Sequence, residues 1–169
     1  MTDAESTITD AAAPDDSDSA DRPVPSFTID LPPDWVLTDH PDALFAMRLD
    51  EETDGAWSNV VVRHMRVASG TSYPTLARAT WRAFEAENPG AVVVDERLVR
   101  FGAVHYVREF EVPQTGNGDS VTRIDSFAFG PRADLPMVDL FLMTWLHPTQ
   151  FGDRLKKTYV RMLSSMSFT

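Results

Sequence analysis

The hydrophobic pattern of the chain is centred on one apolar stretch, residues 137–147, which reads Met-Val-Asp-Leu-Phe-Leu-Met-Thr-Trp-Leu-His. Successive side chains of a β-strand point to opposite faces of the sheet. Here both alternating sets are apolar, with Val138, Leu140, Leu142 and Leu146 on one face and Phe141, Met143 and Trp145 on the other. An exposed sheet face does not tolerate such a row, so the stretch predicts a central strand that is covered on both sides.

Shorter alternating stretches predict the rest of a sheet. Strands are expected at residues 27–31, 35–37, 43–49, 57–67, 92–96, 98–101, 104–112, 121–129 and 167–169. Pro32 and Pro33 stop the first of them, because proline cannot donate a ladder hydrogen bond. We expect the next strand to turn back on the first as a hairpin and to place the Trp35 indole on the core.

Apolar residues at helical spacing predict two helices, at residues 73–88 and 149–163. The first carries a stripe of Tyr73, Leu76, Ala77, Thr80 and Phe84, and the second a stripe of Phe151, Leu155, Tyr159 and Met162. Ser72 is a suitable N-cap for the first helix. The sequence therefore predicts an α+β fold, an antiparallel β-sheet flanked by helices on both faces.

Residues 1–25 differ in composition from the rest of the chain. They hold seven acidic residues against a single arginine, Arg22, and most of the remainder is Ala, Ser, Thr and Pro. Such a segment buries too little apolar surface to offset the entropy of ordering it. We expect a disordered acidic tail at residues 1–25 and a single domain at residues 26–169, because 169 residues are few for two separate cores.

Charge and composition exclude several classes of protein. A formal net charge of −11 repels phosphate backbones, so nucleic acid is a poor partner. The absence of cysteine excludes disulfides and thiolate nucleophiles. No apolar stretch reaches the roughly 18 residues of a membrane span, and no secretory signal is visible. The default expectation is a cytoplasmic location.

Catalytic and metal-binding patterns are missing from the sequence. There is no Gly-x-Ser-x-Gly elbow for a nucleophilic serine. The four histidines are His40, His64, His105 and His147. No pair of them has the helical spacing of zinc ligands. The acidic loop at residues 50–54 lacks the ligand spacing of a twelve-residue calcium loop. We therefore predict no enzymatic activity, no cofactor and no metal.

The tryptophans are a first candidate for binding, because this residue anchors either cores or interfaces. The chain has four, Trp35, Trp57, Trp81 and Trp145. Trp81 and Trp145 are expected in the core. Trp57 lies beside the acidic loop and at a strand start, and it is the candidate for an interface.

A short basic stretch is the second candidate. Arg63, His64 and Arg66 lie within the strand predicted at residues 57–67. They would form a small positive patch on a sheet face, suited to an acidic peptide or to the protein's own tail. Ion pairing with Glu109 or Glu111 is the alternative interpretation.

Four features carry a resemblance to a known fold. They are a Phe-x-Ile-x-Leu-Pro-Pro-x-Trp opening at residues 27–35, Trp-Ser-Asn-Val-Val-Val at residues 57–62, one mid-chain helix, and a strand meander ending in a helix and Ser-Phe. Together they resemble the PsbP-like fold shared with the yeast Ran-release factor Mog. Among bacterial proteins, the chain is most similar to the actinobacterial LpqN/LpqT-type proteins and to the DcrB family.

The resemblance covers roughly residues 26–169 and implies a PsbP-like α/β/α sandwich. It also implies a non-catalytic accessory or adaptor role, and it defines no catalytic residues. LpqN-type members are typically lipoproteins, and this chain departs from them by lacking both the signal and the cysteine.

Three functional hypotheses follow from the sequence. The first is a non-enzymatic binding or adaptor protein that recognises another protein. The second is a cytoplasmic chaperone that shields apolar segments of a secreted client, as some relatives do for type VI secretion effectors. It predicts a concave face with roughly several hundred Å² of exposed apolar side chains, more than a monomer usually shows. The third is a small-ligand carrier or enzyme with a pocket between a helix and the sheet. A homodimer through a sheet edge or face is compatible with all three.

Overall fold

The structure is a computed structural model that describes residues 22–51, 58–101, 103–113, 120–131 and 136–169. The predicted turn at residues 114–119 and most of the predicted tail lie outside these ranges. Three residues that the composition assigns to the tail, Arg22, Val24 and Pro25, lie against the domain.

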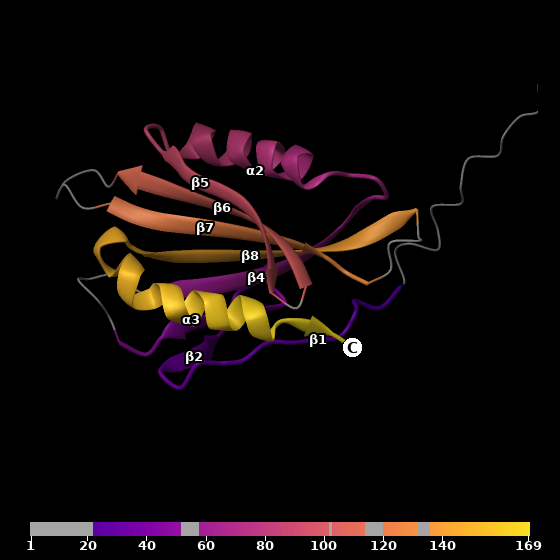
Figure 1. Ribbon diagram of the computed structural model, residues 1–169, viewed down its shortest axis with the longest axis horizontal. Helices are drawn as coiled ribbons and strands as arrows, with labels where there is room; N and C mark the ends of the chain where they lie inside the picture. Colours follow the sequence, from indigo (N-terminus) through magenta and orange to yellow (C-terminus); the bar gives the residue numbers. More distant parts are fainter. Residues whose placement is uncertain (1–21, 52–57, 102, 114–119, 132–135) are drawn as a thin grey trace, which may run out of the picture.

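Seven antiparallel strands form the main sheet, in the order β2-β3-β4-β8-β7-β6-β5 (Figure 1). Their bounds are Trp35–Thr38 for β2, Phe45–Leu49 for β3, Asn59–Ala68 for β4, Val92–Phe101 for β5, Ala103–Pro113 for β6, Ser120–Phe129 for β7 and Met137–Pro148 for β8. β8 is the middle strand, paired with β4 on one side and with β7 on the other. The predicted central strand is therefore confirmed, and so is the mixed α+β class with a large antiparallel sheet.

Both faces of β8 are buried, as the alternating pattern requires. Phe141 and Trp145 lie on one face, and Leu140 lies on the other; each is at most 1% exposed. Two hydrophobic clusters result, one on each face of the sheet.

The helix α2 (Tyr73–Glu87) contacts the face of the sheet that carries Leu140. The Tyr73 ring lies 4.6 Å from that of Phe129, which is the cross-strand partner of Leu140. The helix begins as predicted, because the Ser72 side chain accepts a hydrogen bond from the backbone N–H of Thr75. Of its residues only Ala77 is fully buried, so α2 lies shallowly on the sheet.

The helix α3 (Gly152–Ser165) contacts the face that carries Trp145. It follows a short 3-10 turn, η1 (Thr149–Phe151). Its Tyr159 ring lies 5.1 Å from the Trp145 ring in an edge-to-face arrangement. Figure 1 draws α2 above the strands and α3 below β8 and β4, and α3 also contacts the edge strand β5. No helix in the described ranges is long and apolar enough to cross a membrane.

The predicted hairpin between residues 27–31 and 35–37 is wrong. The first strand, β1 (Phe27–Thr28), pairs with the last, β9 (Ser167–Phe168), and β2 pairs with β3. Phe27 packs against Phe141, with ring centroids 5.1 Å apart. This long-range aromatic contact, and not a local turn, fixes the position of β1.

The predicted break between residues 92–96 and 98–101 is also absent. The two segments form one strand, β5, with a β-bulge between Val93 and Asp95. The bulge precedes the predicted break, and the pairing with β6 is regular through Arg97, from Asp95 to Phe101.

Candidate functional site

Large hydrophobic side chains exposed within the described ranges gather at the two edges of the sheet. One group is Val24, Leu31, Leu37 and Leu44, and the other is Val92, Val93, Val94 and Leu98. The first group lies at the β2 edge and the second on β5, at the opposite edge. Exposed apolar residues that cluster, unlike scattered ones, mark an interaction surface.

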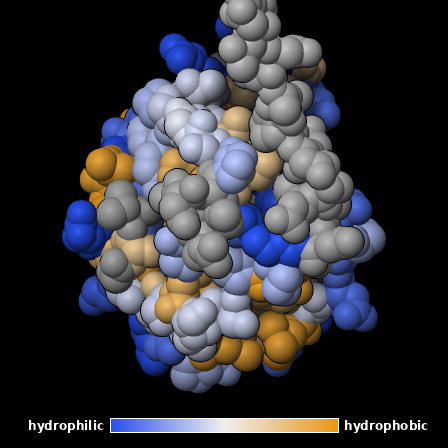
Figure 2. All heavy atoms as spheres, turned by 90° about the vertical axis from the view of Figure 1, so that its right-hand side faces the viewer, coloured by the Kyte–Doolittle hydropathy of each residue, from blue (hydrophilic) through white to orange (hydrophobic). Residues whose placement is uncertain are grey.

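The first group lines an open apolar groove of about 640 Å³. One wall is the chain segment from Val24 to Leu31, and the other is formed by Leu37 and Leu44 with two residues of β3, Phe45 and Met47. Figure 2 shows hydrophobic surface gathered at the lower edge of the face turned toward the viewer, the side on which Figure 1 places β1 and the C-terminus. We call this feature the β2 groove.

The groove exists because the core stops partway along β2. Trp35 and Leu37 point to the same face of this strand. Trp35 is buried and packs edge-to-face on Trp145, with ring centroids 5.1 Å apart. Leu37, two residues further on, is 66% exposed. Because β2 is the last strand on this side, the outward backbone groups of Trp35–Thr38 have no strand partner among the residues that the structure describes.

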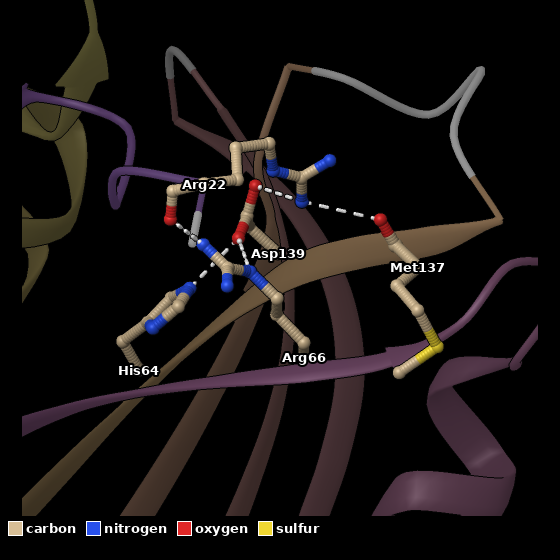
Figure 3. Close-up of polar contacts among 5 residues, drawn as sticks. All are labelled: Arg22, His64, Arg66, Met137 and Asp139. Atoms are coloured by element: carbon tan, nitrogen blue, oxygen red, sulfur yellow. Dashed lines mark hydrogen bonds and ion pairs between the residues drawn. The ribbon is translucent and has the colours of Figure 1, made fainter. Parts of the chain in front are cut away.

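A buried carboxylate holds the start of the groove wall in place (Figure 3). Asp139 of β8 is 1% exposed, and its Oδ2 accepts a hydrogen bond of 2.8 Å from Arg22. Its Oδ1 accepts from His64 Nε2 at 2.8 Å and from Arg66 Nε at 3.2 Å. Arg22 also donates to the Met137 carbonyl, and Arg66 donates to the Arg22 carbonyl. We call these side chains the Asp139 cluster.

The cluster keeps the Asp139 carboxylate ionised. Burial alone raises the pKa of a carboxyl group, because it disfavours the charged form. Here the hydrogen bonds from His64, Arg66 and Arg22 outweigh burial, and the pKa of Asp139 lies below its ordinary value. The cluster therefore fixes Arg22, and the groove wall that follows it, to the central strand.

The structure separates the residues of the predicted basic patch. His64 and Arg66 lie opposite Phe141 and Asp139 on β8 and belong to the Asp139 cluster. Arg63 lies on the other face of β4, where its Nη2 is 3.4 Å from His40 Nε2. Trp57 lies outside the described residues.

The partner of His64 and Arg66 is also different from the one considered in the sequence. Glu109 and Glu111 lie on β6, and two strands, β8 and β7, separate β6 from β4. The only hint of the real partner was a single aspartate, Asp139, inside the apolar stretch. Such a residue in a central strand needs buried cations nearby.

A second, smaller cavity of about 250 Å³ lies between α3 and the sheet. Charged and polar residues line it, among them Arg97, Glu109, His147, Lys156 and Tyr159. Burial lowers the pKa of His147 and raises that of Tyr159. The imidazole Nδ1 of His147 lies 2.9 Å from the Pro148 carbonyl. A neutral ring that donates there has Nε2 as a hydrogen-bond acceptor.

No family profile matches the sequence, and no curated protein matches it. Among solved structures, the chain is similar to LpqN of Mycobacterium tuberculosis, which is described as involved in cell envelope biogenesis. The TM-score is 0.69 at 13% sequence identity, over 89% of this chain and 87% of LpqN. It is also similar to the cyanobacterial PsbP protein CyanoP from Synechocystis sp. PCC 6803. That TM-score is 0.57 at 18% identity, over 85% of this chain and 86% of CyanoP.

The chain has the PsbP-like fold. The resemblance inferred from the sequence is confirmed, including the similarity to LpqN. At these identities the likeness carries the fold and does not carry a function.

Proposed function

We propose that this PsbP-like protein is a non-enzymatic accessory protein that binds an extended apolar segment of another protein in the β2 groove. The observation that carries the proposal is the position of four exposed large hydrophobic residues along one concave surface beside a free strand edge.

An extended segment suits both the free edge of β2 and the β2 groove beside it. Its backbone would add a strand to Trp35–Thr38, and its alternate side chains would enter the groove. Main-chain hydrogen bonds then supply affinity with little sequence preference, and the groove selects apolar side chains. Burial of exposed apolar side chains supplies the rest of the binding free energy.

The chaperone hypothesis is a more specific form of the same proposal. A client whose apolar segment must be shielded before secretion would occupy the same groove, and the apolar lining of the groove supports this form of the proposal. The role described for LpqN, in cell envelope biogenesis, is compatible with an accessory function at large. A cytoplasmic location stays a prediction.

Two equally exposed leucines on opposite sheet edges give a matched test. Leu37 is 66% exposed in the groove, and Leu98 is 63% exposed on β5. Fluorescently labelled 12-residue peptides rich in Val, Leu and Phe would be titrated with the wild type, Leu37→Asp and Leu98→Asp, and followed by fluorescence polarisation. We expect Leu37→Asp to weaken binding at least tenfold and Leu98→Asp to leave it unchanged. Equal binding by both variants, or none by the wild type, would refute the proposal.

A small-ligand carrier is a second candidate, favoured by the cavity between α3 and the sheet. His147, Glu109 and Lys156 supply an acceptor, an anion and a cation within one cavity of about 250 Å³, which suits a small polar molecule. A thermal-shift screen of small polar metabolites would test this role. A hit should raise the melting temperature of the wild type and leave that of His147→Phe unchanged.

A further inference from the structure

The second group of exposed hydrophobic residues lies on β5, the other edge strand of the sheet. β5 is ten residues long, and within the described ranges of the chain its outward backbone groups have no strand partner. Long apolar edge strands are templates for pairing with another chain. The proposed function does not use this edge.

The bulge divides β5 into two parts. The register with β6 is irregular between Val93 and Asp95 and regular from Asp95 to Phe101. A bulge interrupts pairing and twists an edge. The part of β5 fit to pair with a further strand is therefore residues 95–101.

Three exposed side chains on one face of this part have a symmetric arrangement. Glu96, Leu98 and Arg100 alternate along the strand, and all three are exposed. The two charged residues flank the leucine at equal distances in sequence and have opposite signs. Arg100 makes no ion pair within the part of the chain that the structure describes, whereas the Glu96 carboxylate already accepts hydrogen bonds from Tyr106 and Arg108 of its own chain.

We propose that two copies of this chain pair through β5, antiparallel, with Leu98 on the two-fold axis. In that register Leu98 of one copy faces Leu98 of the other, and Glu96 of each copy faces Arg100 of its partner. Opposite charges directly across an antiparallel pair stabilise it, and like charges destabilise it. Residues 95 and 101 then lie opposite each other, so the pairing covers the regular part of β5 and ends at the bulge.

Neighbouring registers lack this complementarity. An axis at Arg97 would place the two Arg97 side chains opposite each other and set Glu96 against Leu98. An axis at Glu96 would place two carboxylates opposite each other. Glu96 is ionised in the fold, because hydrogen bonds from Tyr106 and Arg108 lower its pKa. Among these three centres, charge favours Leu98.

The occupant is a second copy because the strand is complementary to itself. An unrelated strand would need its own matching charges, whereas a two-fold axis supplies both Glu96–Arg100 pairs at once. A contact limited mainly to one strand pair lies at the small end of protein interfaces, below about 1,200 Å² in total. We therefore expect a dimer whose dissociation constant is micromolar and whose population depends on protein concentration.

A disulfide tests the register, because the chain has no cysteine of its own. Residues directly opposite in an antiparallel pair have Cα atoms about 4.5 to 5.5 Å apart, within the range that a disulfide spans. We expect Leu98→Cys to form a covalent dimer on mild oxidation, seen on non-reducing gels. Leu37→Cys, matched in exposure but on the other edge, should remain mostly monomeric. Equal cross-linking of the two variants, or none by Leu98→Cys, would overturn the proposal.

Analytical ultracentrifugation of the full chain tests the association itself. The wild type should show a concentration-dependent dimer between about 1 and 500 μM, the range expected for such a small interface. Leu98→Arg and Arg100→Glu should each raise the dissociation constant at least tenfold, and Arg100→Lys, which keeps the charge, should restore it to within about threefold. A wild type that stays monomeric throughout contradicts the inference. So does a dimer that Leu98→Arg leaves intact.

Discussion

Arg22 and Asp139 lie 117 residues apart in the sequence, yet the Arg22 guanidinium donates a 2.8 Å hydrogen bond to the Asp139 carboxylate. The contact joins the first residue that the structure describes to the central strand of the sheet. It also fixes one end of the wall of the β2 groove, because Val24 and Pro25 follow directly. The same contact thus serves the fold and the candidate binding surface.

Removal of the Asp139 charge should destabilise the protein. Asp139→Asn leaves two guanidinium groups and an imidazole without their anion, and breaking a buried ion pair from one side is costly. Arg22 and Arg66 retain some exposure, so we expect a loss of about 2 kcal/mol in the free energy of unfolding, below the usual range for fully buried pairs. Urea denaturation measures it. Glu85→Gln, on the exposed side of α2, is the control and should change little.

Removal of Arg22 should act mainly on the groove wall. Arg22→Ala breaks the contacts with Asp139 and with the Met137 carbonyl but leaves Asp139 paired with His64 and Arg66. We expect faster amide hydrogen exchange in residues 24–31, with exchange in β8 unchanged. Peptide binding in the groove should weaken in parallel. If exchange in β8 accelerates as much as in the wall, the anchoring role of Arg22 is contradicted.

His105 should make the protein less stable in mild acid. It is 1% exposed, its Nδ1 lies 3.0 Å from Ser126 Oγ, and burial lowers its pKa to about 4. The unfolded chain takes up a proton at this side chain below about pH 6.5, whereas the folded protein does so only near pH 4. The neutral His105 ring therefore leaves the free energy of unfolding at its full value above pH 6.5. That free energy decreases as the pH falls from 6.5 to 4.

The loss should reach about 2 to 3 kcal/mol at pH 4, because each unit of pKa shift corresponds to about 1.4 kcal/mol. Urea denaturation at several pH values between 7.5 and 4 measures it. His105→Gln should show a flatter dependence, and its stability at pH 7.5 separates the packing effect from the titration. A variant as acid-sensitive as the wild type would exclude His105 as the cause.

Trp145 should be the most sensitive position in the core. It is fully buried and its ring contacts those of Trp35 and Tyr159. Trp145→Ala should cost about 3 to 5 kcal/mol. Trp145→Phe should cost distinctly less, since it removes an indole N–H that is buried with no hydrogen-bond acceptor among the described residues. Thermal unfolding compares the two variants, and a Phe variant as unstable as the Ala variant would show that packing alone decides.

Much of the fold could be predicted because it depends on local periodicity. The two apolar faces of β8 predicted a central strand, and the helical spacing of apolar residues predicted α2 and α3. Ser72 predicted where α2 begins. The order of strands could not be read in this way. Phe27 pairs with Phe168 at the other end of the chain, and the local sequence around either residue does not indicate which strand it pairs with.

The candidate site was harder to predict, because it depends on which residues the fold brings together. The sequence grouped Arg63, His64 and Arg66 in one patch, but the alternation of β4 places His64 and Arg66 on one face and Arg63 on the other. His64 and Arg66 do not form a free positive patch. Both hydrogen-bond to the buried carboxylate of Asp139, because β4 pairs directly with β8.

The sequence by itself determined where strands and helices form, because backbone geometry repeats every two or every 3.6 residues and the apolar pattern must follow it. Only the tertiary structure decided which apolar residues remain in contact with water. Trp35 and Leu37 have the same place in the alternation of β2, and one is buried against Trp145 while the other lines an open groove. Exposure depends on what the rest of the chain covers, and that is set by long-range packing.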